Sequence, residues 1–208
     1  MKARSFLLRF VVITVFTSAI ISSGLATVVT FDELSENGTG SFLANGYQGL
    51  AWSNFVVQNA IVYTANNGLK GYYYGMVSAS NNAFNAFGNP AEIDSLSTNF
   101  NFQSAYLTGA WNSNLNIQVQ GFRGGGLIYN QTVVASATNA TLFTFNYLNI
   151  DSLTFNSFGG QSAGFPGGSG NNFVMDNFTF DLVPEPSSLL LATGGTLLLW
   201  PILKRKRA

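Results

Sequence analysis

Two aspartates are the side chains in this sequence best placed to do chemistry. Asp32 ends an apolar segment near the start of the chain, and Asp176 lies inside an alternating apolar segment, residues 173–182. Alternate residues of a strand share a face, which groups Asp176 with Phe178 and Phe180. A buried unpaired charge is very costly, so Asp176 needs a bulge that turns it outward, hydrogen-bond donors or a cation. If Asp32 and Asp176 converge, calcium is the predicted cofactor, because it binds carboxylate oxygens; a bulge or a turn amide explains the same pattern without metal.

Four aromatic residues could stack on sugar rings: Tyr47, Trp52, Tyr73 and Trp111. Aromatic rings present large flat faces, and the many Asn and Gln side chains could hydrogen-bond sugar hydroxyls. Trp52 and Trp111 both lie in strand-like segments, so burial in the core is the alternative for each. Tyr73 stands between two other tyrosines, and alternation along a strand would turn it opposite to both. At least one of these three tyrosines is therefore expected to be exposed.

Missing residue types exclude several kinds of site. The chain has no cysteine and no histidine, which excludes disulfides, Cys- or His-based zinc sites, Ser-His-Asp triads and cysteine nucleophiles. A glycosidase needs two carboxylates across one bond, one of them with a raised pKa. The acids outside apparent strand ends lie in no apolar run that would raise a carboxyl pKa; they are Glu33, Glu36, Glu92 and Asp94. We therefore expect no enzyme.

The charges are unevenly distributed along the chain. Of the nine basic residues, only Lys70 and Arg123 lie within residues 27–183, which hold eight acids and carry a net charge of −6. Binding to a phosphate backbone requires clustered Lys and Arg. Nucleic acid is thus not an expected partner.

Residues 27–183 show the pattern of an all-β domain. Apolar and polar residues alternate in segments 115–120, 141–147 and 151–155. Turn signals such as Asn-Gly and Gly-Gly separate these from further predicted strands, at residues 28–32, 52–57, 60–64, 72–78, 98–102, 105–111, 127–134 and 173–182. Many short strands without a helix of about ten residues predict a single β-sandwich, and the strand count favours jelly-roll topology.

The two ends predict export. Residues 1–26 combine a basic start, an apolar stretch and small residues before the expected cleavage after Ala26, which is typical of a signal peptide read by the Sec machinery. At the other end, an uncharged leucine-rich segment, residues 187–203, is nearly long enough to cross a membrane as a helix. It is framed by a proline motif, Pro184, Glu185 and Pro186, and by a basic end, Lys204, Arg205, Lys206 and Arg207. Cations are retained on the cytoplasmic side, which places the domain across the membrane.

This three-part tail, residues 184–208, resembles a PEP-CTERM sorting signal. The resemblance implies an exported protein of a Gram-negative bacterium that makes exopolysaccharide, processed near the proline motif by an exosortase. It also implies an inner-membrane intermediate followed by the cell surface or extracellular matrix. The tail carries no information about activity.

The body resembles uncharacterised jelly-roll domains of PEP-CTERM proteins, on the segments 30–34, 46–52 and 173–180. We therefore expect a non-enzymatic component of the cell envelope or exopolysaccharide matrix. The first alternative is a carbohydrate-binding module with exopolysaccharide as its partner, and a secreted glycan hydrolase is the least favoured.

Overall fold

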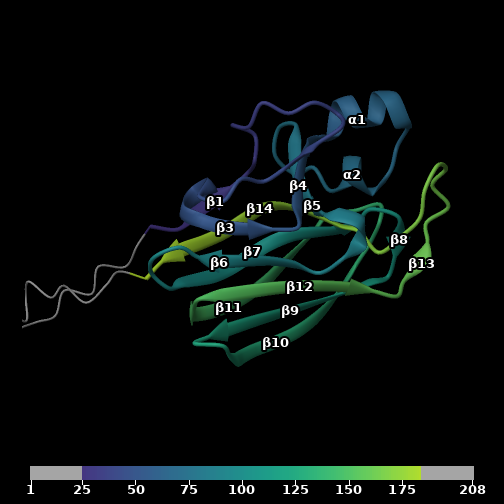
Figure 1. Cartoon of the computed structure of the whole chain (residues 1–208). Coiled ribbons are helices and arrows are strands. Elements are labelled where there is room, and N and C mark those ends of the chain that lie inside the picture. The colour runs from purple at the N-terminus through teal and green to yellow at the C-terminus, as the bar shows by residue number, and fades with distance from the viewer. Residues whose placement is uncertain (1–24, 184–208) are drawn as a thin grey trace, which may run out of the picture.

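The computed structural model describes residues 25–183 (Figure 1). Most of the predicted signal peptide and all of the predicted sorting tail lie outside this range. Within it, no helix has the length and apolar character needed to span a membrane.

Two antiparallel sheets make up most of the domain. The seven-stranded sheet has the order β11 (Thr141–Ile150), β7 (Phe100–Gly109), β14 (Phe173–Leu182), β5 (Asn81–Asn85), β4 (Phe55–Asn59) and β2 (Ser41–Phe42), with β1 (Thr27–Val29) also paired to β14. The five-stranded sheet has the order β10 (Gly126–Ala135), β9 (Leu115–Arg123), β12 (Ser152–Phe158), β6 (Ala91–Ser95) and β3 (Leu50–Ser53). Strands β8 (Asn112–Ser113) and β13 (Gln161–Ser162) form a separate ribbon.

The main core lies between the two sheets and is rich in aromatic rings. Phe102 on β7 is fully buried and stacks on Phe145 and Phe178, with both ring centroids at 4.9 Å. Alternation along β9 and β12 supplies the opposite face, including Ile117 and Phe155. Burying one face of each sheet is what period-two patterning predicts, and the predicted antiparallel β-sandwich is confirmed in outline.

Predicted strand 52–57 is divided between β3 and β4. Predicted strands 98–102 and 105–111 lie mostly within the single strand β7.

Two further predicted strands are helical instead, and the first is helix α1 (Ala60–Asn67). Asn59 caps it, because its side-chain oxygen accepts hydrogen bonds from the amides of Ile61 and Val62 at 3.1 and 3.0 Å. Gly68 ends the helix with a positive φ of 81°. The apolar start of this segment resembles a strand, and the cap at Asn59 is what makes it a helix.

The second wrong strand, residues 72–78, begins as helix α2 (Gly71–Tyr74). A β-carbon at Gly71 would lie 1.9 Å from the carbonyl oxygen of Gly109, and one at Gly75 would lie 2.7 Å from a methyl carbon of Val174. Only glycine at both positions allows this turn of helix to rest directly on the sheet.

Helices α1 and α2 cover the outer face of the seven-stranded sheet, on the side away from β9 and β10 (Figure 1). A second, smaller cluster of apolar residues is buried beneath them. It consists of Tyr72, Ala110, Trp111 and Val174, with Tyr63, Phe84 and Phe165 packed against them.

Candidate functional site

The two predicted aspartates meet at one loop, residues 77–81, which joins α2 to β5. Asp176 accepts hydrogen bonds from the amides of Val77 at 2.6 Å and Ser78 at 2.9 Å. Asp32 accepts from the next three amides, those of residues 79–81, at 2.9 to 3.1 Å. Five consecutive N–H groups are therefore bound by two carboxylates, and this fixes α2 above the sheet.

A bulge in β14 explains how Asp176 avoids the main core. The register against β7 shifts between Asp176 and Thr179, and Asn177 between them has a positive φ of 49°. Phe173 and Met175 before the shift and Phe178 and Phe180 after it face the main core. Asp176 instead lies fully buried under α2, so the bulge turns it away from the main core without exposing it. The amide donors, the other alternative to a cation, are present.

Burial raises the pKa of Asp176, and the hydrogen bonds from Ser78 and Val77 offset only part of that effect. Burial alone would also raise the pKa of Asp32, but the amides of Asn81 and Ser80 outweigh it and hold that pKa below its ordinary value. Within residues 25–183 no three acidic side chains gather closely enough to hold a metal ion. Calcium binding at Asp32 and Asp176 stays a prediction, which unfolding in calcium and in chelator would test.

The structure places Tyr47 and Trp52 together, against the main core. Trp52 is 5% exposed, packs edge-on against Phe55 and Phe178, and donates its ring N–H to the carbonyl of Tyr47 at 2.9 Å. Tyr47 is half-buried and donates its hydroxyl to Glu33 at 2.6 Å. Burial of Trp52 agrees with the core alternative and leaves its ring no free face for a sugar.

Trp111 lies in the outer cluster, whereas Trp52 belongs to the main core, and Trp111 is 9% exposed. The backbone of Gly168 lies against its ring, since a β-carbon there would lie 2.5 Å from it. The ammonium of Lys70, itself 3% exposed, is 5.5 Å from the Trp111 ring centroid and 5.6 Å from that of Tyr63. It also donates a hydrogen bond to the carbonyl of Asn67. The Trp111 ring thus makes a cation–π contact with a buried lysine.

Tyr73 is 39% exposed on the outer side of α2 and packs edge-on against Tyr74. It is the exposed member of the tyrosine triplet, although the triplet is helical rather than extended. The four predicted stacking residues therefore do not form a single surface.

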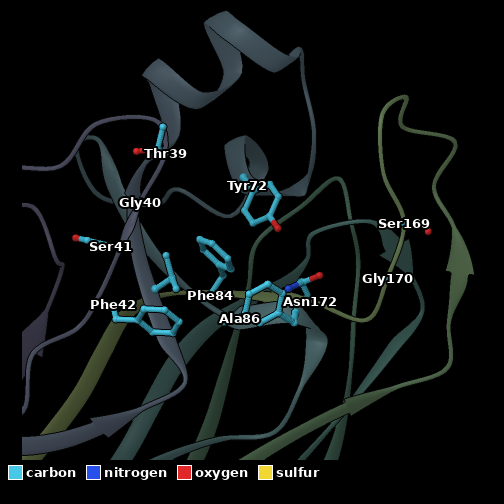
Figure 2. A pocket seen from close by; sticks show the side chains of 12 residues that line it. Thr39, Gly40, Ser41, Phe42, Tyr72, Phe84, Ala86, Ser169, Gly170 and Asn172 are labelled. Atoms are coloured by element: carbon cyan, nitrogen blue, oxygen red, sulfur yellow. The ribbon is translucent and has the colours of Figure 1, made fainter.

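A different set of aromatic residues surrounds an open groove of about 570 Å³ beside α2 (Figure 2). The buried ring of Tyr72 and the half-buried ring of Phe84 pack edge-to-face at its base, with centroids 5.0 Å apart. Phe42 on β2 is 62% exposed, and Figure 2 shows its ring turned toward the same space as that of Phe84. The other lining residues are Thr39, Gly40, Ser41, Val56, Ala86, Phe87, Ser169, Gly170 and Asn172. None of the lining residues is charged.

Phe87 is the most unusual residue of the groove. Its side chain is 86% exposed, and its backbone has φ 56° and ψ 15°, the left-handed region. A bulky residue in this conformation is rare and costs roughly 1–3 kcal/mol. Such strain persists only where the surrounding structure enforces it.

Asparagine side chains enforce the conformation of Phe87. The amide of Asn54 donates to the carbonyls of Ala86, Asn89 and Pro90 at 3.0 to 3.2 Å, which holds both sides of the turn. Asn85, fully buried, donates to Asn89 at 2.8 Å. These hydrogen bonds hold the turn in a conformation that leaves the Phe87 ring exposed.

Sequence reasoning missed this groove for identifiable reasons. Phe42 and Phe87 lie outside every alternating segment, and β5, a polar strand rich in asparagine, was not predicted at all. The available signal was an isolated Phe in Ala86–Gly88, between Asn85 and Asn89-Pro90, where a turn residue would be expected.

No protein-family model matches the chain, and no curated protein is detectably related to it in sequence. Among solved structures, the chain is similar to a DUF4465 family protein from Bacteroides caccae, with a TM-score of 0.50 and 11% identity over 82% of this chain and 98% of that one. It also aligns with TmCBM61, solved in complex with β-1,4-galactotriose, with a TM-score of 0.41 and 11% identity over 71% of this chain and 99% of that one. At this identity the first likeness shows the fold alone, a two-sheet antiparallel sandwich.

Proposed function

We propose that the domain binds an uncharged carbohydrate chain in the groove lined by Phe42, Tyr72, Phe84 and Phe87. The observation that carries this proposal is Phe87, an 86% exposed aromatic ring held in a left-handed backbone at the groove. Strain of this kind clusters at ligand-binding positions, and Phe87 differs from Phe31, which has a similar φ of 64° but is buried in the main core.

A carbohydrate suits the chemistry of the lining better than other ligands. Phe42 and Phe87 offer flat apolar faces, while Thr39, Ser41 and Asn172 offer neutral hydroxyl and amide groups. Sugar rings present the matching pair of surfaces, apolar C–H faces and hydroxyl edges. An anionic polysaccharide is disfavoured, because residues 27–183 carry a net charge of −6 and no cation lines the groove.

The same lining supports binding without hydrolysis. A glycosidase needs two carboxylates across the scissile bond, and no acid lines the groove. In residues 25–183, the one acid bonded to a lining residue is Glu36, which accepts a hydrogen bond from the Ser41 hydroxyl. A single carboxylate could fill one of the two roles in a glycosidase, but the second carboxyl group of the pair is missing.

The cellular setting that we propose rests on the sequence. Residues 1–26 and 184–208 support an exported, non-enzymatic envelope or matrix protein sorted by an exosortase, with a jelly-roll body. Intact-mass analysis of the protein from its host should show a C-terminus near Pro184–Pro186. Recovery of chains that still end in Lys204–Arg207 would refute processing.

Affinity electrophoresis through gels containing single neutral or acidic polysaccharides tests the binding proposal. We expect retardation in at least one neutral polysaccharide, and about tenfold weaker binding for Phe87→Ala or Phe42→Ala, as the loss of one stacked ring predicts. Phe158→Ala is the matched control, since this ring is 44% exposed but belongs to β12 and not to the groove. Equal losses in all three variants, or retardation by acidic polysaccharides only, would overturn the proposal.

A further inference from the structure

Strand β10 is a long free edge, paired only with β9 in the described part of the chain. From Tyr129 to Ala135 its register with β9 is unbroken, and β10 contains no charged residue and no proline. Leu127, Ile128 and Val134 are 44 to 54% exposed along it. A long, regular, uncharged edge is a template for another strand.

The other edges in residues 25–183 lack this combination. Strand β11 has two register shifts against β7, and its residues Asn146 and Asn149 have positive φ of 53° and 56°. Such bulges interrupt the row of free backbone groups. The remaining edge strands are short, with three residues in β1, four in β3 and two each in β2, β8 and β13. Strand β10 has one register shift, between Leu127 and Tyr129, but beyond it seven residues stay in regular register, which no other edge strand in residues 25–183 offers.

We propose that β10 pairs antiparallel with β10 of a second copy of this chain, about a two-fold axis perpendicular to the sheet. The two five-stranded sheets then become one continuous sheet, and the same patch serves both subunits. Each free N–H and C=O along Tyr129–Ala135 meets its counterpart, and the exposed Val134 and Ile128 gain apolar cover.

The charge distribution selects a second copy as the partner. Residues 27–183 carry eight acids and a net charge of −6, so two copies repel over most of their surface. None of those acids lies on β9, β10 or β12. Strand β10 itself therefore lets two copies approach without like charges. The one charge on these three strands, Arg123 at the end of β9, lies beside Gly126 and outside the regular stretch Tyr129–Ala135.

This dimer would carry two separate grooves. Strand β10 lies on the side of the sandwich away from α1 and α2 (Figure 1), whereas the groove includes Tyr72 of α2. Pairing at β10 consequently leaves both grooves accessible. If each groove binds a glycan chain as proposed above, the dimer links two chains, although dimerisation itself does not depend on that binding.

Disulfide trapping in the full-length chain tests the pairing directly, because the chain has no native cysteine. Single cysteines replace the exposed β10 residues Asn130, Gln131, Thr132 and Val134, alone and in mixed pairs, and Thr144 on β11 provides the matched control. Opposed residues of antiparallel strands lie within reach of a disulfide. We expect oxidation to produce a dimer from at least one β10 position or pair and none from Thr144→Cys.

A charge variant separates specific pairing from chance collision. Thr132→Glu, placed near the two-fold axis, should weaken self-association at least about fivefold in sedimentation, whereas Thr144→Glu should leave it unchanged. Retardation by neutral polysaccharide should persist in Thr132→Glu, which keeps the outcome distinct from failure of the groove. Absence of dimers from every β10 cysteine, or equal trapping at Thr144, would overturn the proposal.

Discussion

The two faces of the seven-stranded sheet are built in different ways. The inner face is apolar and packs on the other sheet through rings such as Phe102 and Phe178. The outer face buries polar side chains under α1 and α2, including Asp176 and Asn82 at 0% and Lys70 at 3% exposure. The stability of the inner face comes from apolar area removed from water, and many side-chain arrangements can bury such area. The outer face depends on directed hydrogen bonds, which fix one arrangement of the side chains.

The outer face also contains the groove, and its polar contacts explain why the groove lies there. Carboxylates that bind loop 77–81 hold α2 and hence Tyr72 in place. Asn54 holds the strained turn at Phe87. If the groove binds a ligand as proposed, the rigidity that a binding site needs comes from these polar contacts.

The largest expected loss of stability comes from a substitution in the inner face. Phe102→Ala removes a fully buried ring and should lower the free energy of unfolding by about 3–5 kcal/mol. Phe84→Ala, on the outer face and half-buried, should cost about half as much or less. Urea unfolding of the purified chain measures both, and equal costs would contradict the division of stability between the faces.

A second prediction concerns the hydrogen bonds of the polar outer face. Asp176→Asn keeps the shape of the side chain but turns an N–H toward the amides of Val77 and Ser78, and should cost about 2 kcal/mol. Asp181→Asn is the control on the same strand, since its partners are the side chains of Asn101 and Gln103. Those side chains can reorient, so we expect a loss below about 1 kcal/mol. Equal losses would mean that the amide contacts of Asp176 contribute nothing special.

The third prediction compares Asp32 with Asp176 by pH. The pKa of Asp32 lies below its ordinary value of 3.8, so its contribution to stability is present above that pH and is lost as pH falls through the lower, folded value. The pKa of Asp176 lies above 3.8, so stability declines as pH rises from 3.8 toward the higher, folded value.

The free energy of unfolding, measured from about pH 2.5 to 6.5 for the wild type and for Asp32→Asn and Asp176→Asn, tests these signs. As pH rises, the advantage of wild type over Asp32→Asn should grow, while its advantage over Asp176→Asn should shrink. Two differences that move in the same direction would show that one of the assigned pKa directions is wrong.

The same division explains what could be predicted from the sequence. Strands of the main core, such as β9 and β12, follow a strict alternation of apolar and polar residues, and this pattern predicts their position and buried face. The need of Asp176 for donors or a bulge was also predictable, since buried charge demands a partner.

The groove could not be predicted in this way. Its position depends on Gly71 and Gly75 resting against backbone and side chains that are distant in sequence, and on the turn that exposes Phe87. Phe42 and Phe87 belong to no periodic segment, and their proximity arises only when β2, β4 and β5 pair. Local patterns do not encode such contacts.

The last prediction concerns the central claim, that strain at Phe87 is retained for ligand binding. Phe87→Gly relieves the left-handed backbone, so the free energy of unfolding should rise by about 1 kcal/mol. The same variant lacks the exposed ring, so affinity for the neutral polysaccharide that retards the wild type should fall about tenfold.

Thermal unfolding and affinity electrophoresis on one preparation of Phe87→Gly, with Phe158→Ala beside it, provide the decisive measurement. A more stable protein with weaker binding is the result that we predict, with binding unchanged in the control. A variant that gains stability and binds as well as the wild type would contradict the account, because the strained ring would then serve no ligand.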